Sequence, residues 1–276
     1  MNIKTSGISQ DDDMDDDSQC FLQGYLQYSR WMLWNSCYQS AYATLIASDT
    51  TNWMLHGFVS NSAFSIPAAI SALYNLKEIW IENVPSLVGA LPECLGNLQG
   101  LEWLVLSKTC LSGPLPESLA SCTRLRHVDL SRCKFSGVFP CQFKNLVALE
   151  YFDVSHNELE GSLCDDAIGD WPRLRKLDLS ENRFHGSLPT KLGQLTMLQQ
   201  LILAKNNFVG SIPASFGTLV ELTHMDVSEN IGLSGALSFE KPPKLKKLKA
   251  GNTQPSADYN FVVDSVGGME SCAQRL

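Results

Sequence analysis

Aspartate and histidine are the side chains of this sequence whose spacing could indicate acid–base or metal chemistry. The aspartates share the third position of short apolar segments such as HVDLS and KLDLS: Asp129, Asp153, Asp178 and Asp226. The histidines are dispersed along the chain: His56, His127, His156, His185 and His224. His127 and His224 begin equivalent segments that are four apart. Because such segments stack about 5 Å apart as neighbouring strands, these histidines are too distant to share a metal ion.

The surroundings of these residues favour a structural role over a catalytic one. The aspartates fill one place in a recurring strand pattern, and motif matches without a surrounding site carry little weight. The sequence has no glycine-rich phosphate loop, no histidine pair at metal-ligand spacing and no nucleophile elbow. The acidic run DDDMDDD lacks the spaced ligands and the glycine of a calcium loop. We therefore predict a non-enzymatic protein without a cofactor or a metal site.

Aromatic side chains on consecutive segments are the stronger candidates for a binding site. Four rings occupy strand positions that point away from the apolar core: Trp80, Trp103, His127 and Tyr151. Exposed tryptophan and tyrosine contribute much of the binding energy at protein interfaces, and aromatic faces also stack on sugars. The acceptors that complete the predicted ligand-binding site are Glu78, Asp129 and Asp153. The alternative is that the N-terminal region packs over these rings.

The segments belong to a repeat that positions these side chains. Its copies begin at Leu76, Leu101, Leu125, Leu149, Leu174, Leu198 and Leu222, with a degenerate copy at Leu245. Successive complete copies are 24 or 25 residues apart, and a fixed period of this size marks a solenoid. Each copy reads L-x-x-L-x-L-x-x-N-x-L-x-G-x-L-P-x-x-L-x-x-L. The alternation in its first half predicts a short strand, and the three-residue apolar spacing after the proline predicts a short helical segment.

A polar residue follows each predicted strand, although this position points inward. It is asparagine in most copies and threonine or cysteine in two others: Asn157, Asn182, Asn206, Asn230, Thr109 and Cys133. An asparagine side chain donates and accepts, so it can pair backbone groups that the turn leaves open. We therefore interpret Cys133 as a ladder residue rather than a reactive thiol. Glycines recur where the chain needs unusual dihedral angles or close stacking: Gly113, Gly137, Gly161, Gly186, Gly210 and Gly235.

The stretches LSGPLPESLASCTRLRHVDLS and FVGSIPASFGTLVELTHMDVS resemble the plant-type leucine-rich repeat, whose mark is L-x-G-x-[IL]-P after the strand. The resemblance covers roughly residues 64–250, or about seven to eight copies of 24 residues. It implies an α/β fold, a right-handed solenoid with a concave parallel β-sheet and short 3-10 or α segments on the convex side. The first complete copy, ENVPSLVGALPECLGNL, resembles early repeats of polygalacturonase-inhibiting proteins and receptor-like proteins.

The same resemblance implies recognition rather than catalysis. It predicts that the concave face binds a protein or peptide, or a glycan, in a receptor-like or inhibitor-like role in signalling or defence. The alternative is an intracellular scaffold that uses the solenoid for protein–protein interaction. The scaffold is favoured by the lack of a signal peptide and of glycosylation sequons in the sequence given, and by nine scattered cysteines, which suit reduced thiols.

The regions outside the repeats predict three further segments. Residues 1–18 form a disordered acidic arm in this prediction, because like charges at that density repel. Residues 19–63 are rich in aromatic residues and predict a helical N-terminal cap, since the open end of a solenoid must be covered. Residues 251–276 predict a C-terminal cap or tail.

Charge and hydropathy restrict the partners. The net charge is −8, but six of the 29 acidic residues lie within residues 11–17, so the rest is nearly neutral. We therefore expect no nucleic-acid partner, which would need a basic surface. No apolar run reaches the roughly 18 residues of a membrane span. On the chain as given, the lack of a signal peptide and of sequons and the odd number of cysteines favour the cytoplasm; an incomplete N-terminus would instead favour an extracellular or cell-surface location.

We predict that hydrogen exchange separates the acidic arm from the repeats. Residues 11–17 offer no apolar burial to offset chain entropy, so their amides should exchange at the rate of an unfolded peptide. The strands around Leu130, Val154 and Leu179 should exchange most slowly. Strong protection of residues 11–17 would show instead that the arm is docked.

Overall fold

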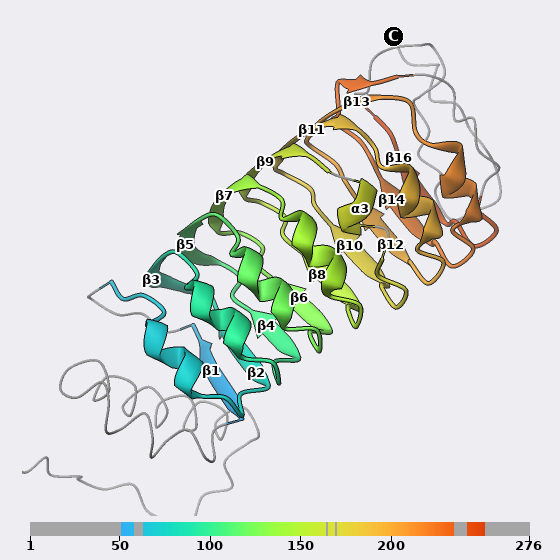
Figure 1. Ribbon diagram of the computed structural model, residues 1–276. Helices are drawn as coiled ribbons and strands as arrows, with labels where there is room; N and C mark the ends of the chain where they lie inside the picture. Colours follow the sequence, from blue (N-terminus) through green and yellow to red (C-terminus); the bar gives the residue numbers. More distant parts are fainter. Residues whose placement is uncertain (1–50, 58–62, 164, 169, 235–241, 252–276) are drawn as a thin grey trace, which may run out of the picture.

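Two parallel sheets and a row of short helices form the solenoid. The computed structural model describes residues 51–57, 63–163, 165–168, 170–234 and 242–251. A typical coil contributes a strand to one sheet, then a strand to the other, then a short helical segment. Figure 1 shows these coils stacked in sequence from β1 to β16. The predicted α/β solenoid is confirmed.

The larger sheet contains nine strands, all parallel, in the order of the chain. They are β1 (Asn52–His56), β2 (Glu78–Glu82), β4 (Trp103–Val105), β6 (His127–Asp129), β8 (Tyr151–Asp153), β10 (Lys176–Asp178), β12 (Gln200–Ile202), β14 (His224–Asp226) and β16 (Lys247–Lys249). Neighbouring strands pair without a register shift, so equivalent positions of successive repeats lie side by side. One sequence position therefore becomes one straight column on the face of the sheet.

The smaller sheet and the helices complete each coil. The seven-stranded sheet contains β3 (Val84–Gly89), β5 (Thr109–Gly113), β7 (Lys134–Val138), β9 (Glu158–Ser162), β11 (Arg183–Ser187), β13 (Asn207–Gly210) and β15 (Gly232–Leu233). The 3-10 helices are η1 (Ala68–Ala72), η2 (Glu93–Asn97), η3 (Glu117–Ser121), η4 (Cys141–Asn145), η5 (Thr190–Gln194) and η6 (Ala214–Thr218), and α3 (Asp165–Ile168) is α-helical. Each 3-10 helix follows an extended proline, as the repeat pattern predicts.

Apolar side chains at the repeated leucine positions fill the inside of every coil. The central residue of each three-residue strand of the larger sheet is buried, for example Leu104, Phe152 and Leu177, and β2 buries Ile79. Burying one such side chain contributes about 1.5–3 kcal/mol, and each coil depends on its neighbours to cover its open sides. Trp171 is fully buried and donates its indole N–H to the Phe143 carbonyl at 2.9 Å. The core is therefore continuous along the stack.

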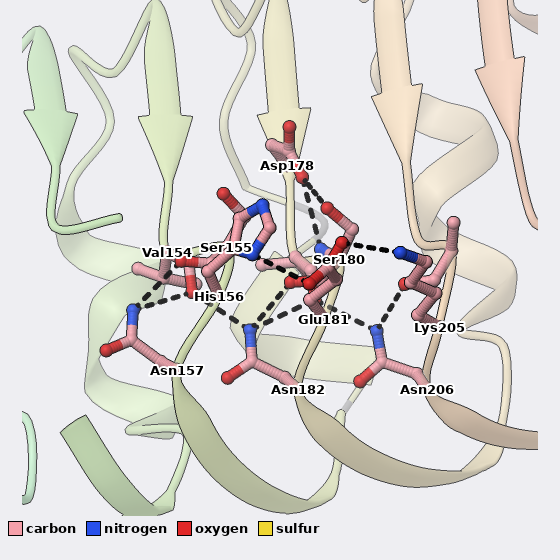
Figure 2. Close-up of polar contacts among 12 residues, drawn as sticks. Val154, Ser155, His156, Asn157, Asp178, Ser180, Glu181, Asn182, Lys205 and Asn206 are labelled. Carbon is pink, nitrogen blue, oxygen red and sulfur yellow. Dashed lines mark hydrogen bonds and ion pairs between the residues drawn. The ribbon is translucent and has the colours of Figure 1, made fainter. Parts of the chain in front are cut away.

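Asparagine side chains bond the coils together on the inside of the turn (Figure 2). Asn182 Nδ2 donates to the carbonyls of Val154, Leu179 and Ser180 at 2.9, 3.2 and 3.1 Å. Its Oδ1 accepts the Leu159 N–H at 3.0 Å. One buried amide thus satisfies backbone groups of two coils.

The other ladder positions use the same geometry. The Nδ2 groups of Asn157, Asn206 and Asn230 each donate to a carbonyl of the preceding coil at 2.9–3.0 Å. Thr109 Oγ1 donates to the Leu106 carbonyl at 3.0 Å, and Cys133 Sγ lies 3.2 Å from that same oxygen. Burial raises the pKa of the Cys133 thiol. Its placement in the ladder agrees with the sequence interpretation.

Each turn also contains a residue with positive φ that the sequence analysis did not predict. The residues with φ of 54–57° are not glycine: Asn83, Lys108, Arg132, His156, Glu181, Lys205 and Glu229. This conformation costs about 1–2 kcal/mol per residue, and the adjacent ladder bonds hold it. Charged neighbours pair along this edge, for example Lys205 with Glu181 at 2.8 Å (Figure 2). Five predicted glycines have φ of 82–88°; Gly235 lies outside the described residues.

The first strand lies within the segment predicted as a helical cap. β1 pairs with β2 in register, and it buries Trp53 and Leu55 while Met54 alternates outward. The predicted start of the solenoid at residue 64 is therefore too late for the larger sheet. The sequence analysis missed β1 because its inward residues lack the repeat's leading leucines. The predicted arm, the remainder of the cap before residue 51 and the tail after residue 251 lie outside the described residues.

The cysteines are in mixed states. Cys94, Cys110, Cys122 and Cys133 are free thiols, whereas Cys141 is disulfide-bonded. The expectation of reduced thiols is therefore wrong for Cys141. Scattered cysteines gave no pairing signal in the sequence, because the fold and not the spacing along the chain decides which thiols meet.

Removing a ladder amide should destabilise the protein. Asn182→Ala leaves buried carbonyls without a donor, and we expect the free energy of unfolding to fall by about 2–3 kcal/mol in urea titrations. Asn207→Ala is the matched control, because Asn207 is exposed on β13, and it should stay within about 0.5 kcal/mol. Equal effects of the two substitutions would contradict the ladder's role.

Candidate binding site on the nine-stranded sheet

Four aromatic rings form a stack across the outer face of the larger sheet. We call Trp80, Trp103, His127 and Tyr151 the ring column. The ring centroids are 6.3 Å apart for Trp80 and Trp103, 4.6 Å for Trp103 and His127, and 4.1 Å for His127 and Tyr151. The interplanar angles are 16°, 15° and 8°. The sequence analysis placed these residues together correctly, and the structure adds that they stack on one another.

Strand register explains most of the ring column. Trp103, His127 and Tyr151 are in-register partners on β4, β6 and β8. Trp80 comes from a different column, since its partner on β4 is Val105, while Glu78 is the partner of Trp103. The Trp80 indole therefore reaches diagonally towards Trp103. A bulky ring can span such a diagonal on one face of a sheet.

Lys176 ends the ring column on the β10 side. Its Nζ lies 4.6 Å from the centroid of the Tyr151 ring and donates to Tyr151 Oη at 2.9 Å. It also donates to Asp153 Oδ2 at 2.9 Å and lies 3.7 Å from Asp178 Oδ2. The ammonium group is thus surrounded by partners from β8 and from its own strand, β10. Its placement fixes the position of the Tyr151 ring.

The ionisation of the site follows from partial burial. Burial alone would lower the pKa of Lys176, but its hydrogen bond to Tyr151 and the charge of Asp153 outweigh this effect and raise the pKa. Burial raises the pKa of the Tyr151 hydroxyl. Burial, followed by the charge of Lys176, lowers the pKa of His127 to about 4. At neutral pH the site therefore holds a charged lysine and an uncharged imidazole.

The aspartates of this face cap turns. Asp153 Oδ1 accepts from the Ser155 N–H at 3.0 Å and its hydroxyl at 2.7 Å, and Asp178 bonds Ser180 in the same way (Figure 2). Asp129 accepts from the Ser131 N–H at 3.0 Å. Asp153 is only 5% exposed. These contacts agree with the structural interpretation made from the sequence.

A groove lies beside the ring column at the start of the strands. Its volume is about 370 Å³, and its lining residues are Trp103, Arg126, His127, Glu150, Tyr151, Arg175, Lys176, Gln199 and Gln200. The Arg126 guanidinium pairs with Glu150 at 2.6 Å. Three of the predicted site residues line the groove. Glu78, Asp129 and Trp80 lie outside that lining, as does Asp153.

Lys176 and the arginines and glutamines of the groove are not among the binding residues predicted from the sequence. The register of the repeats is the signal that could have found them. Lys176 and Gln200 continue the column of Trp103, His127 and Tyr151, and the other missed residues each precede a strand. Because they are polar, they look like any solvated strand end in the sequence.

Within the described ranges, no group of three or more His, Cys, Asp or Glu side chains is placed to hold a metal ion. In the same part of the chain, no helix has the length and apolar character needed to cross a membrane.

Comparison with known proteins agrees with the fold. Residues 123–184 and 197–219 match leucine-rich repeat family models. The leucine-rich repeat ectodomain of the membrane receptor kinase GASSHO1/SCHENGEN3 from Arabidopsis thaliana, in complex with CASPARIAN STRIP INTEGRITY FACTOR 2, is 30% identical with a TM-score of 0.62. That match covers 71% of this chain and 22% of the ectodomain. A TDR receptor structure is 29% identical with a TM-score of 0.62, covering 71% and 38% of the two chains.

A third structure covers a larger share of both chains. A plant ice-binding protein is 25% identical with a TM-score of 0.67, over 82% of this chain and 77% of that one. No curated protein matches the sequence. The chain therefore contains leucine-rich repeats similar to those of plant receptors, and it spans 22–38% of the length of the two receptor structures. These matches support a protein-binding module similar to receptor ectodomains.

The low pKa of His127 predicts that the stability of the protein depends on pH. The unfolded imidazole binds a proton near pH 6.5, whereas the folded one does so near 4. Between these values the unfolded state holds more protons, so this residue's contribution to stability falls as pH falls. His127→Phe removes that contribution, so its melting temperature should drop less than that of the wild type between pH 7 and 4.5. Parallel curves for the two proteins would contradict the assignment.

Proposed function

We propose that this protein recognises a protein or peptide ligand through the outer face of the nine-stranded sheet, in a receptor-like or inhibitor-like role in signalling or defence. The observation that carries the proposal is the ring column beside the groove. Stacked rings held by register and by Lys176 form a surface that is ordered before a ligand arrives. Little conformational entropy remains to be lost there on binding, which favours affinity.

The composition of the site supports a protein or peptide ligand. Two tryptophans and a tyrosine are the residue types that dominate the energy of protein interfaces. The groove adds arginines, a lysine and glutamines that can bond to polar groups of a ligand. The GASSHO1/SCHENGEN3 ectodomain, which shares the repeat architecture, is in complex with CASPARIAN STRIP INTEGRITY FACTOR 2. A binding role for the face of this sheet is consistent with that complex.

The disulfide at Cys141 bears on the alternative of an intracellular scaffold. Disulfides persist in oxidising compartments and are rare in the cytosol. A bonded Cys141 therefore supports an extracellular or cell-surface setting for the recognition role. The four free thiols do not oppose it, because Cys122 and Cys133 are buried or serve the ladder.

Substitution of Trp103 tests the proposal. Peptides of 12 random residues displayed on phage would be selected on the full chain, and the tightest binder synthesised for calorimetry. Trp103→Ala should weaken its binding by roughly tenfold or more, because a hot-spot tryptophan contributes about 2 kcal/mol or more. His224→Ala is the control, since His224 is exposed on β14 outside the ring column. Equal affinities of the three proteins would place binding elsewhere.

A further inference from the structure

The faces of three central rings are covered by other groups of the protein. Trp103 lies between Trp80 and His127, and His127 lies between Trp103 and Tyr151. The remaining face of Tyr151 carries the Lys176 ammonium, 4.6 Å from its centroid. A sugar or a ligand cation binds an aromatic side chain through the ring face. The central rings therefore present their edges, and not their faces, to a ligand.

The ring edges differ in whether their polar atoms already have partners. The Trp80 indole helps to lower the pKa of Glu82, after the larger effect of Lys108, and Tyr151 Oη is bonded to Lys176 and Asp153. Trp103 Nε1 and both ring nitrogens of His127 have no hydrogen-bond partner among the described residues, and both rings line the groove. The middle of the ring column thus offers an indole donor next to an imidazole with one donor and one acceptor.

Two of the three basic side chains that line the groove with these free edges are already paired. Lys176 is paired with Asp153, and Arg126 with Glu150. The imidazole itself is uncharged at neutral pH because burial lowers its pKa to about 4. A ligand group that meets Trp103 and His127 therefore needs hydrogen-bonding capacity without a net charge. The amide groups of a polypeptide main chain have this property, with one N–H and one C=O per residue.

We propose that the ring column binds an extended peptide segment by its main chain, with Trp103 and His127 bonding to its amide groups through their ring edges. The inference rests on the proposed function and names the chemistry of its ligand. His127 is the residue that distinguishes this arrangement, because it both donates and accepts. Side-chain preference would come from the adjoining groove, where Arg175, Gln199 and Gln200 also have no side-chain partner among the described residues.

Replacing His127 by phenylalanine isolates the hydrogen bonds from the stack. His127→Phe keeps an aromatic ring between Trp103 and Tyr151 but removes both polar atoms. The probe is the phage-selected 12-residue peptide, acetylated and amidated so that its ends carry no charge. Loss of one or two net hydrogen bonds predicts roughly tenfold weaker binding by calorimetry. His224→Phe makes the same change at the same strand position on β14 and should leave the affinity unchanged.

Amide-to-ester replacement in the peptide tests main-chain recognition directly. With the wild-type protein, an ester at one or two positions of the peptide should weaken binding by about the same factor. With His127→Phe, an ester at those same positions should have no effect on the affinity. If Trp103→Ala weakens binding while His127→Phe and every ester do not, the recognition role survives and the main-chain proposal is wrong. If the peptide binds independently of Trp103 as well, the site itself is wrong. Binding of cello- or chito-oligosaccharides that competes with the peptide and requires Trp103 would also overturn the main-chain proposal.

Discussion

The fold depends on satisfying the backbone groups inside the turn of each coil. A strand that ends and turns inward leaves carbonyl and amide groups away from water, and an unpaired buried group costs about 1–3 kcal/mol. Asn182 satisfies three carbonyls and one N–H at once, and it links its own coil to the preceding one. Because Asn157, Asn206 and Asn230 repeat these bonds in their own coils, the strands there stay in register along the stack.

Because the strands are in register, equivalent outward residues of successive coils line up as columns on the outer face of the larger sheet. The inward leucines and the ladder residues must recur at equivalent positions of successive coils. This requirement keeps neighbouring strands in register. The outward positions carry no such requirement. Trp103, His127 and Tyr151 can therefore be replaced in principle without disturbing the core, whereas Leu104 and Val128 beside them cannot. Alternate residues of a strand therefore have different roles: the inward residues specify the fold, and the outward residues are available to specify a ligand.

The sequence predicted what depends on period and missed what depends on side-chain geometry. The strands, the proline-led helices, the inward asparagines and Cys133 follow from spacing alone, so they were found. β1 was missed because Trp53 stands where the repeat has a leucine. The diagonal placement of Trp80 and the position of Lys176 over Tyr151 depend on rotamers and on neighbours from other repeats. A one-dimensional pattern does not contain those distances.

Partial burial of the ring column connects its stability to its chemistry. Stacked rings exclude water from one another, which keeps His127 uncharged and leaves the Tyr151 hydroxyl protonated. The same exclusion would be costly for Lys176 if Tyr151 and Asp153 did not supply acceptors. The Lys176 ammonium in turn covers the face of the Tyr151 ring that the stack leaves open on the β10 side. The charge of Lys176 at the end of the ring column is thus balanced within the protein, so under our proposal the rings select a ligand by hydrogen-bond geometry and shape.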